Sequence, residues 1–378
     1  MPTSSGLHIL QDSGVPDGST EYTTLVLLHG YAWHSGILSK LLPLAKQHNA
    51  RIILVNRRDY PGTRPYSEEE RALLPVLSPE GGAADAAEMA EAKEKLLTFM
   101  KGRAREVYDL LVELVTNEDL PPAQPEENKG GIVVAGWSFG SAWMTALLAH
   151  VASFGVNDVD LSAYVRRVVF LDPAYHTLGY PHPARPGYNP LLDPEVPLEE
   201  RGRWFSDWVS GYYIHGDTFE TLEQKTPLQH PPPTLSTLTP EEVEAAQYLP
   251  PIVPGGSDVA VFEGGLQLGL FTALKDGALY LPSKGNGDAA EEDGDDEDDP
   301  QGNAWPNVEV RYVHCENSVW HLPWGTWALK KEVEEAKQKG LPIRNVRMVH
   351  IRGANHFVPW DATELALRAL LGDEDEVS

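Results

Sequence analysis

Six segments of the chain are short runs rich in apolar and β-branched residues, and most of them end at a glycine or a polar residue. Such runs are typical of strands that are buried on both faces of a parallel sheet. They span residues 23–30, 51–56, 131–136, 166–172, 308–315 and 346–353. The pattern therefore predicts a parallel sheet at the centre of the protein.

The segments between these runs carry apolar residues at helical spacing. The longest, from about Ala83 to Val115, is rich in alanine and glutamate. Shorter helical patterns cover residues 37–47, which Pro43 interrupts, and residues 140–153, 330–340 and 363–371. Strands that alternate with helices predict an α/β protein with a doubly wound, mostly parallel sheet that is covered on both faces.

One long segment breaks this alternation. Residues 175–305 are rich in proline and aromatic residues, show no clear strand pattern, and are densest in aromatic residues at 203–213, RWFSDWVSGYY. We expect this segment to be a cap inserted between two parts of one core, residues 1–174 and 306–378. The length of 378 residues is long for one compact domain, which agrees with a core and an insertion.

An acidic run lies within the predicted cap. Nine acidic side chains fall between Asp288 and Asp299, with no basic residue and few apolar groups among them. A stretch of this composition buries too little apolar surface to order itself, so residues 283–302 are predicted to form a disordered, solvated loop. Calcium binding is the alternative, but the run lacks the glycine and glutamate spacing of an EF-hand loop.

The charge balance excludes some classes of partner. The chain has 30 basic and 56 acidic side chains, which give a formal net charge of −26. Sequence-independent binding of nucleic acid or of anionic lipid depends on cationic surface, so neither is expected. A chaperone-like or assembly role for the acidic run is not favoured either, because the run is one loop in an otherwise globular pattern.

Cysteine content and hydropathy indicate the cellular compartment and exclude some kinds of site. Cys315 is the single cysteine, so an internal disulfide is excluded. The sequence MPTSSGLHILQDSG lacks the basic and apolar parts of a signal peptide, and no stretch reaches the roughly 20 apolar residues of a membrane-spanning helix. No Cys/His cluster has the spacing of a zinc site. We expect a cytoplasmic protein without a membrane segment, metal or cofactor.

The main chemical signal is the sequence GIVVAGWSFGSAW at residues 131–143, where Gly-x-Ser-x-Gly joins a predicted strand to a predicted helix. Such a turn holds its serine in a strained backbone conformation at a helix N-terminus. Glycine neighbours are needed because strand and helix crowd together there. This context favours Ser138 as a nucleophile over a serine in an ordinary turn.

A serine hydroxyl needs a general base to take its proton. Of the thirteen histidines, His356 is the best placed, because GANHF forms a loop between the predicted strand at 346–353 and the helix at 363–371. The negative charge that develops on the substrate needs an oxyanion hole. The turn in LLHGYAW places the backbone N–H of Tyr31 where it can act together with that of Phe139.

At LLHGYAW, GWSFG and GANHF the chain resembles the α/β-hydrolase superfamily, whose members carry such motifs in this order. The resemblance covers about residues 22–174 and 306–371. It implies the α/β-hydrolase fold, with Ser138 as nucleophile, His356 as base, and oxyanion donors at the two motifs named above. The serine also argues against epoxide hydrolase or haloalkane dehalogenase chemistry, since those relatives carry an aspartate at this position.

The acid of the catalytic triad is ambiguous in the sequence. Members of the family usually carry it a few residues past the strand before the histidine loop; in register this position is Ser318, and Glu316 lies two residues earlier. Some members use an acid at the end of the preceding strand, where Asp172 lies. Both acids stay open, with a slight preference for Asp172. Either would fix the imidazole tautomer and stabilise the imidazolium.

These residues predict a serine hydrolase that cleaves an ester or lactone of a small hydrophobic substrate. The expected pocket residues are aromatic, for which packing of the cap on the core is the alternative role. They are Trp33, Trp137, Trp204 and Trp208, with Phe205, Tyr212 and Tyr213 beside them. A peptidase or thioesterase with the same triad, and an inactive hydrolase-fold protein that binds a small hydrophobic ligand, stay open as alternatives.

Overall fold

The computed structural model of the chain describes residues 3–75, 86–155, 159–185, 187–281 and 305–378. The predicted acidic loop at 283–302 lies outside the described residues.

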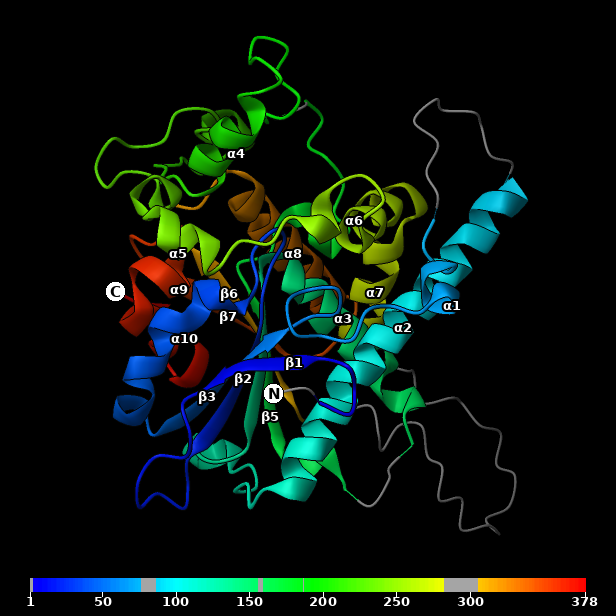
Figure 1. Cartoon of the computed structure of the whole chain (residues 1–378), viewed down its shortest axis with the longest axis vertical. Helices are drawn as coiled ribbons and strands as arrows, with labels where there is room; N and C mark the ends of the chain where they lie inside the picture. The colour runs from blue at the N-terminus through cyan, green and yellow to red at the C-terminus, as the bar shows by residue number, and fades with distance from the viewer. Residues whose placement is uncertain (1–2, 76–85, 156–158, 186, 282–304) are drawn as a thin grey trace.

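An eight-stranded sheet forms the centre of the molecule, in the order β1-β3-β2-β4-β5-β6-β7-β8 (Figure 1). β1 pairs antiparallel with β3, and the other described pairs are parallel, which confirms the predicted mostly parallel sheet. The strands are β1 (His8–Asp12), β2 (Thr23–Leu28), β3 (Ala50–Asn56), β4 (Ile132–Trp137), β5 (Val165–Leu171), β6 (Glu309–Cys315), β7 (Val346–Ile351) and β8 (Glu376–Val377).

The six predicted strands are β2 to β7, and the sequence pattern missed the two edge strands. Ile9 is the one buried residue among the five of β1, and β8 has two residues. Edge strands are short and only partly buried, so neither carries the long apolar run that marks a central strand.

The side chains of the central strands alternate between two apolar cores, one on each face of the sheet. Val26 and Val134 belong to one core, and their neighbours Leu25 and Val133 belong to the other. The first core is covered by α2 (Ala86–Asn117), α3 (Ser141–His150), α7 (Leu270–Leu279) and α8 (His321–Gln338). The second is covered by the 3-10 helix η1 (Ser35–His48), α9 (Val358–Asp361) and α10 (Thr363–Leu371).

Where the structure describes it, the segment 175–305 consists of short helices joined by irregular stretches. It holds α4 (Arg201–Val209), α5 (Pro240–Glu244), α6 (Ser257–Leu268) and α7, whereas the short α1 (Glu68–Arg71) lies before α2. In the view of Figure 1, α4, α5 and α6 lie above the sheet. Leu270 and Leu274 of α7 are buried in the same apolar core as α3, so α7 packs against α3 on this face of the sheet.

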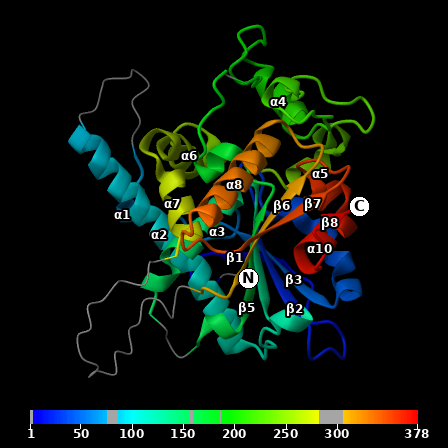
Figure 2. The ribbon, with the colours of Figure 1, turned by 180° about the vertical axis from the view of Figure 1, so that it is seen from behind.

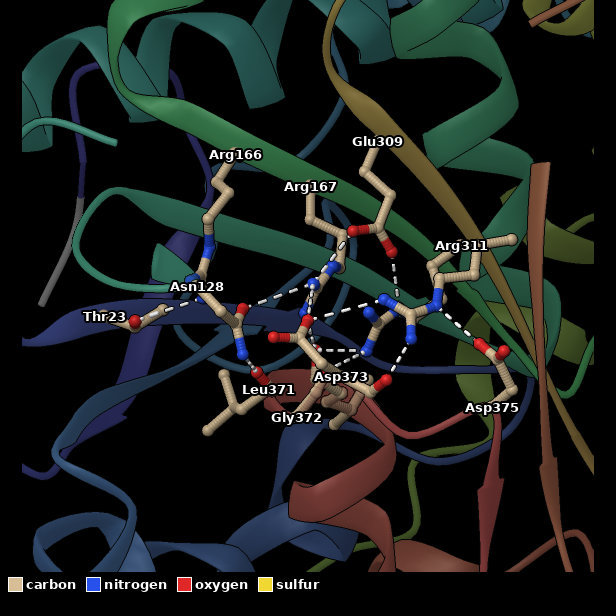
Figure 3. Close-up of polar contacts among 12 residues, drawn as sticks. Thr23, Asn128, Arg166, Arg167, Glu309, Arg311, Leu371, Gly372, Asp373 and Asp375 are labelled. Atoms are coloured by element: carbon tan, nitrogen blue, oxygen red, sulfur yellow. Dashed lines mark hydrogen bonds and ion pairs between the residues drawn. The ribbon is translucent and has the colours of Figure 1, made fainter. Parts of the chain in front are cut away.

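An arginine cluster joins the amino ends of β5 and β6 to the end of α10 (Figure 3). Arg167 donates to Leu370 O at 2.8 Å, and Arg311 donates to the carbonyl oxygens of Ala369 and Gly372 at 2.7 and 2.8 Å. Glu309 accepts from both arginines, at 2.9 and 2.7 Å. The cluster thereby satisfies carbonyl groups that the last turn of a helix leaves unpaired. Figure 2 shows the same strands and α10 from behind.

Candidate active site

Ser138 lies directly after β4, with a φ of +54°, in the left-handed region that strains a non-glycine residue. The two glycines of the motif are required by close approach. A Cβ on Gly136 would lie 2.2 Å from Gly140 O, and a Cβ on Gly140 would lie 2.6 Å from His29 O. The short turn therefore leads straight into η3 (Ser138–Gly140) and α3 and holds the serine at their N-terminus.

Two hydrogen bonds link Ser138, His356 and Asp172 in a line. Ser138 Oγ lies 2.9 Å from Nε2 of His356, and Nδ1 of His356 lies 2.8 Å from Oδ2 of Asp172. An ionised carboxylate only accepts hydrogen bonds, so the imidazole proton is on Nδ1. Nε2 is then free to accept the proton of the serine hydroxyl. Both partners of the ion pair are buried, with side-chain exposures of 6% and 0%.

Asp172 is fixed in place by further donors. Ser318 Oγ donates to Oδ2 at 2.7 Å, and the backbone N–H of Cys315 donates to Oδ1 at 3.0 Å. Asp172 itself has a φ of +48° at the end of β5. These two donors, together with the imidazole, fix the orientation of the Asp172 carboxylate.

The second candidate acid lies elsewhere. Glu316 is exposed, and its Oε2 accepts the backbone N–H of Gly353 at 2.8 Å. The structure therefore brings Asp172, and not Glu316, to His356. Ser318, which stands where the family usually has its acid, contacts Asp172 instead.

The turn after β2 abuts the serine. A Cβ on Gly30 would lie 3.0 Å from Cβ of Ser138. The backbone of Tyr31, the next residue, therefore starts close to Ser138. The N–H of Phe139 belongs to the first turn of a helix, which has no partner within that helix. The N–H of Tyr31 donates in none of the backbone hydrogen bonds of the described residues. Both amides are available to an oxygen of a bound ligand.

Sequence reasoning missed a buried ion pair behind this turn. The guanidinium of Arg57 donates to the carbonyl oxygens of His29 and Gly30, and it pairs with Asp258 of α6 at 2.9 and 2.7 Å. Two consecutive arginines directly after an apolar strand, in VNRRDY, were the available signal, because a charged side chain beside a buried strand needs partners.

A chain of ring contacts runs from Phe139, the residue after Ser138, through α6 to two histidines. The ring of Phe262 lies 5.7 Å from that of Tyr31 and 5.8 Å from that of Phe139. His176 lies 5.0 Å from Phe262 and 5.3 Å from His321. Tyr31, Phe262 and both histidines are partly accessible, as is Ser138. Phe262 and the two histidines were not among the predicted residues.

The two histidines are neutral at pH 7. Burial lowers the pKa of His176 to about 3, with a smaller effect of His182. Burial, and then the neighbouring His176, lower the pKa of His321 well below its usual value. The chain of ring contacts that begins at Phe139 thus ends in two uncharged imidazoles.

Two of the predicted pocket tryptophans, Trp33 and Trp137, pack in the apolar core close to the loop that carries His356. Trp137 donates its indole N–H to the carbonyl oxygen of His356 at 2.9 Å, and its ring lies 5.2 Å from the imidazole. Trp33 is buried and its ring lies 6.2 Å from that of Phe357. Both belong to the apolar core on the η1 face of the sheet. Trp137 therefore packs against the loop that carries His356 and holds its backbone through this hydrogen bond.

The predicted pocket residues of α4 fall into two groups. Trp204 is 41% exposed and donates to Glu200, and no described contact joins it to the triad. Trp208 is buried, its ring lies 5.0 Å from that of His321, and its ring lies 5.7 Å from that of Phe205.

The two tyrosines after α4 connect the segment 175–305 to α9 and to the loop after β6. Tyr212 donates to Asp361 of α9 at 2.7 Å, and Tyr213 donates to the carbonyl oxygen of Trp208 at 2.7 Å. Asn317 also donates to the carbonyl oxygen of Tyr213, at 2.6 Å. These contacts correspond to the packing role that the sequence left open for the aromatic residues.

Neither a metal cluster nor a membrane span is found in the described part of the chain. No group of three or more His, Cys, Asp or Glu side chains there is arranged to hold a metal ion. No helix among the described residues combines the length and apolarity needed to cross a bilayer.

Comparison with known proteins places this chain in a family. The model of the alpha/beta hydrolase family matches residues 25–369, whereas no curated protein matches the chain. Epoxide hydrolase I of potato (Solanum tuberosum) shares 14% identity over 94% of this chain and 92% of its own, with a TM-score of 0.41. A bromoperoxidase of Bacillus anthracis shares 14% over 96% and 94%, with a TM-score of 0.42. A lipase-esterase related protein of Clostridium acetobutylicum shares 12% over 95% and 94%, with a TM-score of 0.39.

Proposed function

Because the chain belongs to the alpha/beta hydrolase family, which confirms the resemblance of its three motifs, we propose that it is a serine hydrolase. It cleaves an ester or lactone of a small hydrophobic molecule through an acyl-enzyme. The observation that carries the proposal is the hydrogen-bonded line Ser138–His356–Asp172, with spacings of 2.9 and 2.8 Å. This is the arrangement that activates a serine hydroxyl in acyl transfer.

The reaction proceeds in two displacements. Ser138 Oγ attacks the carbonyl carbon while Nε2 of His356 takes its proton, and the Asp172 carboxylate stabilises the imidazolium. The amides of Tyr31 and Phe139 hold the oxyanion of the tetrahedral intermediate, and each such donor contributes roughly 100- to 1000-fold in rate. His356 then protonates the leaving alkoxide. Water, deprotonated by the same imidazole, hydrolyses the acyl-enzyme and returns the proton to Ser138.

The side chains around the serine support a neutral, hydrophobic substrate. The rings of Tyr31, Phe139 and Phe262 offer apolar surface, and the neutral imidazoles of His176 and His321 offer hydrogen bonds without charge. Arg57 places a buried charge close to Phe139, and this charge is matched by Asp258. A charged substrate would lose its hydration here without gaining a partner of opposite charge. The free thiol of Cys315 is consistent with a cytoplasmic location.

Covalent labelling tests the proposal without a known substrate. The purified protein is treated with a fluorophosphonate and analysed by intact mass, beside Ser138→Ala and His356→Gln. We expect one adduct on the parent, mapped to the peptide that holds Ser138, and none on Ser138→Ala. His356→Gln should react at least 1000-fold more slowly, because the serine then lacks its base.

Other outcomes separate the alternatives. A folded parent without an adduct would point to the inactive, ligand-binding protein. An adduct at another serine would refute the role of Ser138. If the adduct forms, then nitrophenyl esters, a lactone panel, acyl-thioesters and nitroanilide peptides distinguish an esterase or lactonase from a thioesterase or a peptidase.

A further inference from the structure

A buried arginine fixes the turn that carries Tyr31. Arg57 lies directly after β3, and its Nε donates to His29 O at 3.2 Å while Nη2 donates to Gly30 O at 2.8 Å. The backbone N–H of Arg57 donates to Nε2 of His29 at 3.0 Å, so the imidazole proton must be on Nδ1. Nδ1 in turn donates to Gly30 O at 3.0 Å. The carbonyl group of Gly30 therefore accepts two hydrogen bonds.

This carbonyl group determines the direction of the proposed oxyanion donor. Gly30 C=O and Tyr31 N–H belong to one peptide group, which is planar, and in the trans form the two bonds point in opposite directions. A carbonyl that is held toward Arg57 therefore directs the N–H of Tyr31 away from Arg57. Rotation of this peptide would require the loss of both hydrogen bonds to Gly30 O in a buried environment.

Asp258 of α6 orients the arginine. Its two carboxylate oxygens lie 2.9 and 2.7 Å from Nη1 and Nη2 of Arg57, and the hydroxyl of Tyr60 donates to Oδ2 at 2.7 Å. The guanidinium also lies 4.0 Å from the ring centre of Trp143. Both charged side chains are almost fully buried, and a bidentate pair of this kind fixes the plane of the guanidinium.

The same helix contributes to the surroundings of the serine. Phe262 follows Asp258 by one helical turn, and its ring contacts those of Tyr31 and Phe139, the two residues that supply the oxyanion amides. α6 therefore holds the backbone of the turn through Asp258 and covers its side chains through Phe262.

We infer that Arg57 is a positioning residue for the Tyr31 amide. Because Asp258 of α6 holds Arg57, the position of this amide depends on how α6 packs on the core. The inference rests on the proposed function for its catalytic consequence. A displacement of α6 disturbs the oxyanion donor while the hydrogen bonds of Ser138 and His356 stay in place, because neither residue contacts the ion pair.

The test compares this ion pair with a second, partly buried pair. Arg57→Met combined with Asp258→Asn removes both charges, so neither is left unpaired and the fold is retained more readily than after a single change. Arg57→Lys keeps the charge and loses the planar fork. The matched control is Glu332→Gln, which breaks the pair between Lys275 of α7 and Glu332 of α8.

Hydrolysis of p-nitrophenyl acetate and inhibition by phenylboronic acid are measured for each variant. We expect kcat to fall about 10- to 100-fold in the Arg57 variants, with KM within about threefold, since part of the effect of one oxyanion donor is lost. The affinity for phenylboronic acid, which forms a tetrahedral adduct with the serine, should fall by a similar factor. Glu332→Gln should change each value by less than about threefold. Equal effects in the control and in the Arg57 variants would overturn the inference.

Crystal structures of the parent and the double variant provide a readout that does not need activity. The peptide between Gly30 and Tyr31 should rotate or show two orientations in the variant, and an unchanged orientation would also overturn the inference. If the parent does not react with a fluorophosphonate, the proposed function fails, and the peptide orientation alone decides whether Arg57 positions this amide.

Discussion

Replacement of Asp172 by Asn is the sharpest test of the triad geometry. The asparagine side chain has nearly the same volume, and its Oδ1 can still accept the N–H of Cys315 while its amide group faces Ser318 and His356. The amide then donates toward Nδ1, where the carboxylate accepted at 2.8 Å. The imidazole responds by placing its proton on Nε2, which leaves Ser138 without a proton acceptor.

The size of the effect follows from this tautomer change. A triad that loses its acid in this way loses about 10,000-fold in kcat, equivalent to about 5.4 kcal/mol of transition-state stabilisation at about 1.36 kcal/mol per tenfold. Stability should change little, because the Cys315 N–H keeps its acceptor and the Ser318 hydroxyl can accept from the new amide group. Thermal unfolding therefore separates a catalytic effect from a structural one.

Glu316→Gln is the matched control, since it removes the charge of the other candidate acid. Its amide oxygen can still accept the N–H of Gly353, so kcat should stay within about threefold of the parent, as for an exposed substitution. Turnover of p-nitrophenyl acetate and the rate of fluorophosphonate labelling are measured for both variants. Loss of activity in Glu316→Gln comparable to that in Asp172→Asn, or more than a tenth of parental activity in Asp172→Asn, would refute the assignment.

Three further predictions concern the triad and the stability of the fold. Exchange of the two contacting residues, Asp172→Ser with Ser318→Asp, should recover at least tenfold over Asp172→Ser alone, because the new carboxylate lies beside the same imidazole; no recovery in turnover would show that position 318 cannot serve His356. Burial alone would raise the pKa of Glu70, but the Ser67 N–H and the side chains of Arg58 and Arg103 lower it to about 2, so its contribution to stability is present above about pH 4.5 and is lost as the pH falls toward 2. Urea unfolding should therefore show Glu70→Gln to be about 1–3 kcal/mol less stable than the parent at pH 7, with a difference that shrinks below pH 4.5; a constant difference would contradict this. Arg311→Met should cost about 3–5 kcal/mol, because it leaves Glu309 and two carbonyl groups of the α10 end with fewer partners, whereas Arg347→Met should cost less than about 1 kcal/mol; equal losses in urea unfolding would argue against the cluster of Figure 3.

The local pattern of the sequence was sufficient for the fold class and for two of the three residues in the hydrogen-bonded line Ser138–His356–Asp172. Central parallel strands are apolar throughout because both faces are buried, so β2 to β7 were visible as runs. Ser138 and His356 could be predicted because each lies at a fixed place relative to a strand end. The two glycines of Gly-x-Ser-x-Gly are needed because strand and helix approach closely within these five residues.

The acid and the surroundings of the serine depended on contacts between distant segments. Asp172 and Glu316 both lie near strand ends, and only the three-dimensional packing of the loops that follow β5 and β7 brings Asp172 to His356, 184 residues away. The Arg57–Asp258 pair spans 201 residues and involves a helix within a segment that has no strand pattern. Side-chain partners of this kind are set by how the elements pack in three dimensions. The period of a single strand or helix records which face is buried, and it does not record which distant residue lies on the other side.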